Sequence, residues 1–157
     1  VKDTFAGLQN LGRAARARTS AAVVAVTGSV GKTGTKEALK CALGAQGATA
    51  ATEGNLNNHW GVPLSLSRMP RESKFGVFEL GMNHAGEIAP LAKLVQPHVA
   101  VITAIEAVHL EFFDSVDAIA DEKAAIMDGP KRIFPFGRPV SLSRLMSSGG
   151  ERLNLRL

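Results

Sequence analysis

The sequence lacks the features that mark secreted and membrane proteins. Its single cysteine, Cys41, excludes an internal disulfide and fits a reducing setting. No apolar run is long enough to cross a bilayer, and no signal-peptide pattern opens the chain. We therefore expect a cytoplasmic protein without membrane insertion. Its 157 residues are enough for one domain with a buried core.

Acidic residues are almost absent from the last part of the chain. Residues 130–157 contain six basic residues and one acidic residue, a net charge of +5. Residues 1–129 contain twelve basic and thirteen acidic residues, a net charge of −1, so the main body is close to neutral. The basic segment has neither an aromatic stacking pattern nor a recognised nucleic-acid motif. We therefore expect no nucleic-acid partner.

A glycine-rich segment follows the apolar stretch 21–26. It reads Thr27-Gly28-Ser29-Val30-Gly31-Lys32-Thr33-Gly34 and leads into a helical pattern. Val26 stands where the standard phosphate-binding pattern has its first glycine. Even so, a turn between a buried strand and a helix directs backbone N–H groups and the positive helix end at phosphate, and the lysine and hydroxyl complete the site. We predict a nucleotide phosphate site over residues 27–34, in preference to a plain strand–turn–helix with a surface lysine.

The periodicity of apolar residues predicts alternating strands and helices. We expect helices over residues 3–18, 32–43, 87–96 and 115–128, and strands over residues 23–26, 47–53, 75–80 and 99–104. This alternation predicts an α/β fold with a parallel, doubly wound sheet, which binds ligands at the carboxyl ends of its strands. At the end of the first helix, we expect Arg13, Arg16 and Arg18 to form a solvated face.

Polar groups lie where the predicted strands end. A carboxylate buried there is costly without a cation or a donor, so Glu79 is a candidate Mg²⁺ ligand, or otherwise a hydrogen-bonded carboxylate. Thr33 has the hydroxyl that a phosphate loop offers to the same ion. His109 is a candidate metal ligand or phosphate contact, and alternatively a simple loop histidine. The convergence of these groups with residues 27–34 on one edge of the sheet favours a functional site.

Lys123 interrupts the apolar face of the predicted helix 115–128. The other positions of this face are all apolar: Val116, Ile119, Ala120, Ile126 and Met127. The lysine either extends its ammonium outward to water, or is held inside, where desolvation lowers its pKa. A reactive amine of the second kind can take up carbon dioxide and become a carbamate that binds Mg²⁺.

Asparagines are concentrated in the polar, turn-rich segment 54–63. Asn55, Asn57 and Asn58 offer uncharged amides to phosphate or substrate. Alternatively, they form bonds between side chain and backbone within a tight loop. The residue types alone leave both interpretations open.

Four segments together resemble one family in order and spacing. They are Thr27-Gly28-Ser29-Val30-Gly31-Lys32-Thr33, Gly54-Asn55-Leu56-Asn57-Asn58, Glu79-Leu80-Gly81-Met82-Asn83 with Gly86-Glu87-Ile88, and His109-Leu110-Glu111. Over residues 20–128 they resemble the central ATPase domain of the Mur ligases. The asparagine-containing segments favour the branch that adds D-Ala-D-Ala over the folylpolyglutamate synthetases, which share the mechanism.

The resemblance implies an ATP-dependent amide ligase of peptidoglycan synthesis. Such an enzyme activates the carboxylate of UDP-N-acetylmuramoyl-tripeptide as an acyl phosphate, which the amine of D-Ala-D-Ala attacks. By resemblance, residues 27–34 and Asn55 would contact ATP, with Lys32 neutralising the transferred γ-phosphoryl group. Thr33 and Glu79 would hold one Mg²⁺. The remaining implied roles are a second metal position at His109 and carbamylated Lys123, and substrate contacts at Asn57, Asn58 and Asn83.

The chain departs from the family pattern in two respects. Around Lys123 the family usually has Ala-Lys-x-Glu, whereas this chain reads Glu122-Lys123-Ala124-Ala125. The family also has an N-terminal domain for the UDP-sugar and a C-terminal domain for the incoming amine. We divide the chain into a linker helix (1–19), an ATP-binding central domain (20–129) and an atypical basic tail (130–157). The abrupt change of composition at this tail predicts a truncated or frameshifted product.

Other functions remain open beside the ligase. One is an inactive remnant that binds ATP weakly or merely folds. Another is a general P-loop NTPase or a folate-type ligase.

Overall fold

The computed structural model describes residues 3–108, 110–128 and 132–135 of the chain. Its elements in chain order are α1 (Thr4–Ala17), β1 (Ala22–Thr27), α2 (Lys32–Gly44), β2 (Thr49–Ala51), α3 (Gly61–Arg68), β3 (Phe75–Glu79), α4 (Ile88–Val95), β4 (Val99–Ile102), α5 (Val116–Ala124), the 3₁₀ helix η1 (Ala125–Asp128) and β5 (Arg132–Pro135). In this part of the chain, none of the helices combines the length and apolar character that a membrane span requires.

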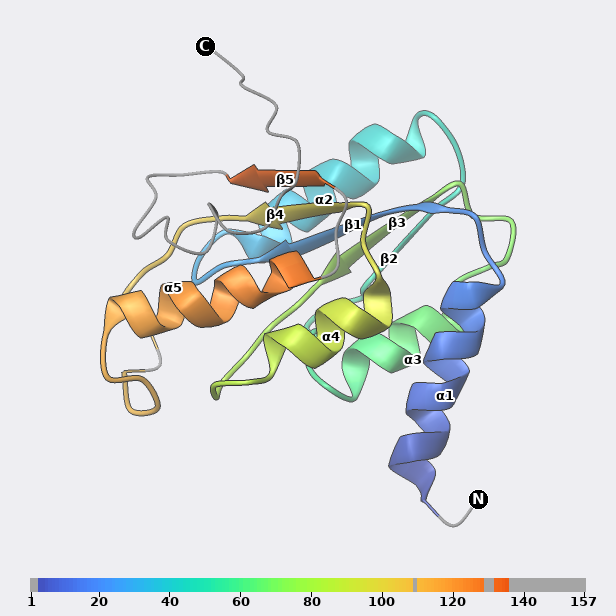
Figure 1. Cartoon of the computed structure of the whole chain (residues 1–157). Helices are drawn as coiled ribbons and strands as arrows, with labels where there is room; N and C mark the ends of the chain where they lie inside the picture. Colours follow the sequence, from blue (N-terminus) through green and yellow to red (C-terminus); the bar gives the residue numbers. More distant parts are fainter. Residues whose placement is uncertain (1–2, 109, 129–131, 136–157) are drawn as a thin grey trace.

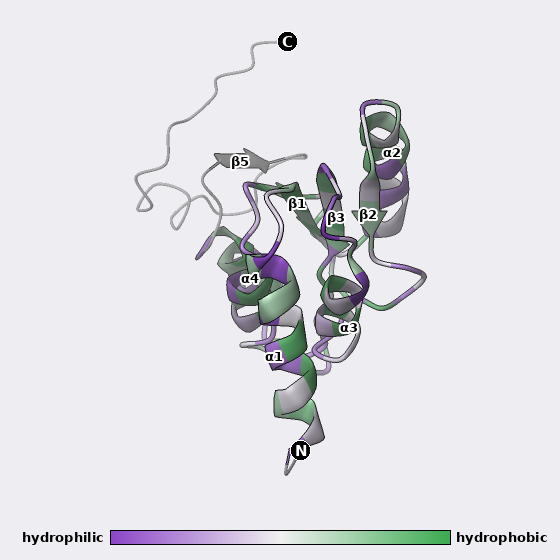
Figure 2. Cartoon of the chain, turned by 90° about the vertical axis from the view of Figure 1, so that its right-hand side faces the viewer, coloured by the Kyte–Doolittle hydropathy of each residue, from purple (hydrophilic) through white to green (hydrophobic). Residues whose placement is uncertain are grey.

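The described strands form one parallel sheet in the order β2-β3-β1-β4-β5. The helix α2 lies on one face of this sheet, and α3, α4 and α5 lie on the other, with α1 packed outside α3 (Figure 1, Figure 2). The prediction of a doubly wound parallel α/β fold is therefore confirmed. The strand β1 occupies the centre, where it pairs with both β3 and β4.

The hydrophobic core lies between the sheet and the α3–α4–α5 layer. Val23 and Ala25 of β1 belong to it together with Phe78 of β3, and all three are at most 1% exposed. The helix α4 contributes Ile88, Leu91, Ala92, Leu94 and Val95. Burial of each large apolar side chain contributes about 1.5–3 kcal/mol. On the opposite face, the one fully buried side chain that α2 supplies is Lys36, so the two faces of the sheet are covered very differently.

The first helix is attached to the helices beneath it by its arginines. Arg16 donates hydrogen bonds to the carbonyls of Val95 (2.8 Å) and Gln96 (3.0 Å) at the end of α4. Arg18 donates to the carbonyl of Met69 at the end of α3 (3.1 Å). The expectation of a solvated face is therefore wrong for Arg16, which is only partly exposed, whereas Arg18 is exposed and makes its hydrogen bond from the surface. The reason is that the last carbonyls of a helix have no partner within the helix, and an arginine from a neighbouring element can supply one.

Two elements of the structure differ from the sequence-based assignment. The helix α3 begins within the segment read as turn-rich, because Pro63 is compatible with a first helical turn and Val62 and Leu66 share a buried face. The strand β5 pairs with β4 beyond the last predicted element. The predicted helix 115–128 also divides, since its last turn tightens into the 3₁₀ helix η1.

Candidate functional site

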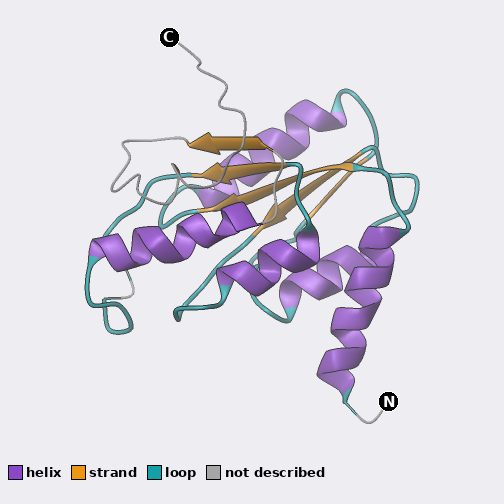
Figure 3. Cartoon of the chain, viewed as in Figure 1, coloured by secondary structure: helices purple, strands orange, loops and turns teal. Residues whose placement is uncertain are grey.

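The loops that follow β1, β3 and β4 emerge at the same end of the sheet (Figure 3). The chain leaves β1 for α2 on one face, whereas it leaves β3 and β4 for α4 and α5 on the other. Adjacent strands with connections on opposite faces create a crevice at their carboxyl ends, the usual ligand position of this fold. The predicted phosphate loop and Glu79 both lie at this crevice.

The phosphate loop, residues 27–34, has a backbone that requires glycine at two positions. Gly28 has φ +148° and Gly31 has φ +86°, in a region that other residues rarely adopt. A Cβ atom at Gly28 would also collide with the hydroxyl of Thr103, which lies just past the end of β4. That hydroxyl donates to the carbonyl of Val30 (2.7 Å), so β4 helps to hold the loop. In the sequence, Thr103 differs from other threonines only by its place at the end of a strand, which is too weak a signal to predict this contact.

The ammonium of Lys32 is folded back over the loop. Its Nζ donates to the carbonyls of Gly28 (2.7 Å) and Ser29 (3.3 Å). Partial burial lowers the pKa of Lys32, and the negative charge of Glu79 opposes this shift. The lysine is thus electrostatically coupled to the carboxylate at the end of β3.

The carboxylate of Glu79 is the centre of a small hydrogen-bond network. Glu79 is 2% exposed, yet its Oε2 accepts a hydrogen bond from Thr33 Oγ1 (3.0 Å) and its Oε1 accepts one from Asn57 Nδ2 (2.9 Å). The backbone N–H of Glu79 donates to the buried hydroxyl of Thr52 (3.0 Å). Sequence analysis did not single out Thr52. The network shows how the protein satisfies a carboxylate that would otherwise be costly to bury.

Thr33 and Glu79 provide the oxygen ligands that Mg²⁺ prefers. Their Oγ1 and Oε2 atoms are 3.0 Å apart beside the phosphate loop. Magnesium usually takes one or two protein oxygens and completes its shell with water and substrate phosphates. Within residues 3–108 and 110–128, no three His, Cys, Asp or Glu side chains gather as a metal cluster. The two protein oxygens of Thr33 and Glu79 fit a magnesium ion that completes its shell with water and phosphates.

Asn57 and Asn58 have different surroundings. The side chain of Asn57 donates to Glu79. The backbone carbonyl of Asn57 accepts a hydrogen bond from the N–H of Gly81 (2.7 Å). A side chain at Gly81 would meet the Asn57 amide at 2.8 Å, so this approach depends on the glycine. Asn58 Oδ1 accepts the backbone N–H groups of residues 60 (3.1 Å) and 61 (2.9 Å), a bond pattern between side chain and backbone that starts α3.

The other predicted contact residues lie around this network. Asn55 is exposed in the turn that precedes Asn57. Asn83 is also exposed, and its N–H donates to Glu87 (2.7 Å) in the loop after β3. Thr27 is fully buried and its hydroxyl donates to the carbonyl of Leu80, so its side chain joins β1 to β3. The structure brings Lys32, Thr33, Glu79 and Asn57 together, while His109 lies outside the described residues.

Lys123 is held inside the protein. It is 2% exposed, so the interpretation of an outward-extended side chain is wrong. Burial and, to a smaller extent, the positive charge of Lys32 lower its pKa to about 8, although the negative charge of Glu122 opposes both effects. The amine is therefore far more readily deprotonated than an ordinary lysine. The electrostatic effect of Lys32 on this pKa indicates that the Lys123 amine is near enough to the phosphate loop to sense its charge.

Glu122 has a partner that the sequence did not reveal. Its carboxylate accepts the backbone N–H groups of Gly86 (2.8 Å) and Ile88 (2.9 Å) at the start of α4. Sequence spacing gives no signal for this contact, because the two elements are more than thirty residues apart.

The Mur ligase middle domain family matches residues 26–134 of the chain. This match covers most of the sequence. The chain belongs to the Mur ligase family. The family assignment agrees with the phosphate loop, the Glu79 network and the parallel sheet described above.

Curated Mur ligases match the chain over most of its length. It is 43% identical over 126 residues to the UDP-N-acetylmuramoyl-tripeptide--D-alanyl-D-alanine ligase of Rickettsia prowazekii (strain Madrid E), covering 80% of this chain and 28% of that protein. The ligase of the same name from Escherichia coli (strain K12) is 43% identical over 129 residues, with 82% and 28% covered. The chain thus spans less than a third of the length of these Mur ligases.

Solved structures of Mur ligases share the fold. A crystal structure of MurF from Acinetobacter baumannii superposes with a TM-score of 0.79 at 44% identity, over 83% of this chain and 29% of that one. MurF ligase from Thermotoga maritima in complex with ADP gives a TM-score of 0.77 at 36% identity, over 83% and 31% of the two chains.

Proposed function

We propose that this chain is the nucleotide-binding part of an ATP-dependent amide ligase. The proposed reaction joins D-Ala-D-Ala to UDP-N-acetylmuramoyl-tripeptide through an acyl phosphate. The observation that carries the proposal is the Thr33–Glu79–Asn57 network beside the Lys32 loop. The identity to ligases of that name and the ADP complex of the Thermotoga maritima relative support both the substrates and the nucleotide.

The phosphate loop would bind ATP in the crevice at the carboxyl ends of β1 and β3. Backbone N–H groups at the start of α2 would face the phosphates, whereas the N–H of Ser29 donates to the carbonyl of Ala104 (2.8 Å) and holds the loop against the end of β4. Lys32 would leave the Gly28 and Ser29 carbonyls and neutralise the charge that develops on the γ-phosphoryl group. Asn55, exposed beside Asn57, would reach the same end of the nucleotide.

Thr33 and Glu79 would hold Mg²⁺, and Asn57 would keep the Glu79 carboxylate in its orientation. The ion would withdraw charge from the β- and γ-phosphates during transfer to the substrate carboxylate. His109 and Lys123, the latter as a carbamate, are proposed for a second metal position. Asn58 and Asn83 are proposed on the substrate side, together with Asn57.

The cytoplasm is the proposed compartment. The lone Cys41 is exposed and free, which fits a reducing setting, and nucleoside triphosphates are used there. No nucleic-acid partner is part of the proposal, since the main body of the chain is near neutral.

Calorimetric titration with Mg-ATP tests the proposal. Lys32→Ala should abolish detectable binding, because it removes the cation from the phosphate loop. Lys40→Ala is the matched control, since Lys40 is exposed two turns further along α2. Equal affinity of wild type and Lys32→Ala would refute the role of Lys32.

Substrate dependence separates the ligase from its rivals. Phosphate release that requires both UDP-N-acetylmuramoyl-tripeptide and D-Ala-D-Ala identifies the ligase. Weak or absent Mg-ATP binding by the wild-type chain favours an inactive remnant. Release that depends on a folate substrate and glutamate identifies the folylpolyglutamate-type reaction instead.

A further inference from the structure

The loop between β3 and α4, residues 80–87, is held by two carboxylates. Glu87 accepts the N–H groups of Asn83 (2.7 Å) and His84 (3.2 Å) from within the loop itself. Glu122 accepts the N–H groups of Gly86 (2.8 Å) and Ile88 (2.9 Å) from α5. The first contact is local, whereas the second joins elements that are distant in sequence.

The two oxygens of Glu122 fit the beginning of α4. Gly86 has φ +85°, and Ile88 is the first residue of the helix. The N-terminal N–H groups of a helix have no partner within it, and a carboxylate there also interacts favourably with the helix dipole. One oxygen accepts the N–H of Ile88 in the first turn of α4, and the other accepts the N–H of Gly86 just before the N-cap Glu87. Charged acceptors make stronger hydrogen bonds than neutral ones.

Glu122 immediately precedes the buried Lys123. Any shift of α5 therefore moves two groups at once: the Lys123 amine and the Glu122 carboxylate that binds the loop. The same loop begins next to Glu79 and carries Asn83. Glu122 is consequently the described polar contact that links the substrate-side loop to the lysine next to the phosphate site.

We propose that Glu122 is a positioning residue of the site: its carboxylate fixes the loop 80–87 relative to Lys123. The role within a ligase rests on the function proposed above. In this chain the acid stands one residue before the lysine, while the position two residues after it is the buried Ala125. Glu122 is thus directed at the start of α4, and it aligns two parts of the site that belong to different elements.

Hydrogen exchange measured by NMR on the ligand-free chain is the first test. Glu122→Ala should accelerate exchange of the Gly86 and Ile88 amides by about ten- to a hundredfold, because each loses a charged acceptor. Glu122→Gln keeps one carbonyl oxygen and should leave one of the two amides close to its original rate. Asp121→Ala removes the same charge from an exposed neighbouring position and should change neither amide.

Chemical labelling of Lys123 distinguishes positioning from general stabilisation. Acetylation by acetic anhydride is quantified by peptide mass spectrometry over a range of pH, and the rate constant of the deprotonated amine is compared, because loss of the Glu122 charge by itself lowers the pKa of Lys123. This rate constant should be larger in Glu122→Ala and unchanged in Asp121→Ala. The amides of Val23 in β1 and Phe78 in β3 should keep their exchange rates. Uniform acceleration of these core amides, unchanged rates at Gly86 and Ile88, or unchanged Lys123 labelling would each overturn the proposal.

Mg-ATP titration of the same variants keeps this inference separate from the proposed function. A wild-type chain that fails to bind Mg-ATP contradicts the ligase proposal. The exchange and labelling results in the ligand-free chain decide the role of Glu122 in either case.

Discussion

At the scale of single residues, the site depends on side chains that satisfy one another. Glu79 is buried, and each of its oxygens accepts a hydrogen bond, from Thr33 and from Asn57. Lys32 adds a positive charge nearby, and the negative charge of Glu79 raises the pKa of Lys32 in turn. A buried carboxylate with neutral donors and a cation near it is well prepared to exchange one donor for a metal ion.

We expect Glu79→Gln to weaken Mg-ATP binding by about ten- to a hundredfold, because the amide lacks the charge that a magnesium ligand supplies. Binding of ATP without magnesium should change much less. Isothermal titration with and without Mg²⁺ measures both. Glu53→Gln, at an exposed position, serves as the control. An equal loss in both conditions would contradict a metal role.

Lys123 should make stability depend on pH. Its pKa is about 8 in the folded chain, against 10.5 for the unperturbed group. Between these values the unfolded chain binds more protons, so the free energy of unfolding rises with pH across this window. Below it, burial of the charge destabilises the fold by at most about 3 kcal/mol.

The variant Lys123→Met lacks this charge and should be more stable than wild type at about pH 7. The difference in the free energy of unfolding should shrink as the pH rises towards 10.5. Urea unfolding in bicarbonate-free buffer measures the effect. Lys40→Met, at an exposed position, should show no such trend. A difference that is constant with pH would contradict a lowered pKa.

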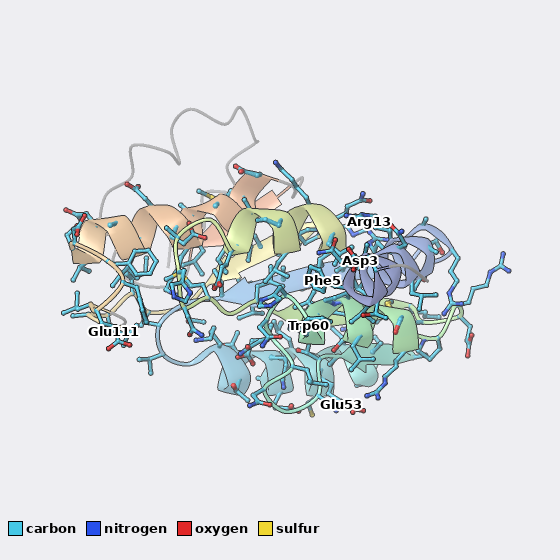
Figure 4. The ribbon with its side chains drawn as sticks, turned by 90° about the horizontal axis from the view of Figure 1, so that it is seen from below. Asp3, Phe5, Arg13, Glu53, Trp60 and Glu111 are labelled. Atoms are coloured by element: carbon cyan, nitrogen blue, oxygen red, sulfur yellow. The ribbon has the colours of Figure 1, made fainter. Side chains whose placement is uncertain are left out.

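At the scale of elements, helix ends carry much of the specific bonding. Asp3 caps α1 by accepting the N–H of Ala6 (3.0 Å), and Ser115 caps α5 by accepting that of Ala118 (3.1 Å). Long-range caps join separate helices, as Arg16 does for α4. The first helix also makes a contact at its other end, where the rings of Phe5 and Trp60 pack with centroids 4.5 Å apart and planes tilted by 58° (Figure 4).

Arg16→Ala should lower the free energy of unfolding by about 1–3 kcal/mol, because the Val95 and Gln96 carbonyls lose a charged donor. Arg13→Ala should have a much smaller effect, since Arg13 is exposed and bonds only within α1. Urea denaturation of both variants provides the comparison. Equal stability of the two would show that water replaces the Arg16 contacts without loss.

At the scale of the whole molecule, the parallel sheet brings distant segments to one edge. Residues 28–34, 79–83 and 103–106 follow three strands that lie side by side in the order β3-β1-β4. The helix α1 lies on the far side of α3, and Figure 4 shows Asp3 and Arg13 of this helix at the opposite end from Glu111. A ligand in the crevice should therefore change the chemical environment of three separate segments and leave that of α1 unchanged.

Mg-ATP should shift the backbone amide signals of residues 28–34, 79–83 and 103–106 together, while those of Thr4–Ala17 stay in place. A two-dimensional NMR titration of the full chain records all of these signals at once. The Lys32→Ala variant should show none of the shifts. Shifts confined to residues 28–34 would contradict a site shared by the three loops.

Much of the fold follows from local patterns in the sequence. The alternation of apolar segments predicts the parallel sheet, because strand and helix periods differ and short buried strands are separated by amphipathic helices. The phosphate loop can also be predicted from local sequence, because its glycines and Lys32 lie within one short segment. The helix α3 escaped prediction because its first turn contains Gly61 and Pro63, which are typical of turns, and β5 escaped because it lies in the basic segment that shows no strand periodicity.

The sequence by itself determined the family, the sheet and the loop that would bind phosphate, because these depend on residues that are close along the chain. Only the tertiary structure decided how the adjacent Asn57 and Asn58 differ: the side chain of Asn57 bonds to Glu79, whereas that of Asn58 bonds to the backbone at the start of α3. It also decided that Lys123 is buried and that Glu122 holds α4. These contacts join segments far apart in sequence, and burial and hydrogen-bond geometry select them only when the sheet has brought the segments together.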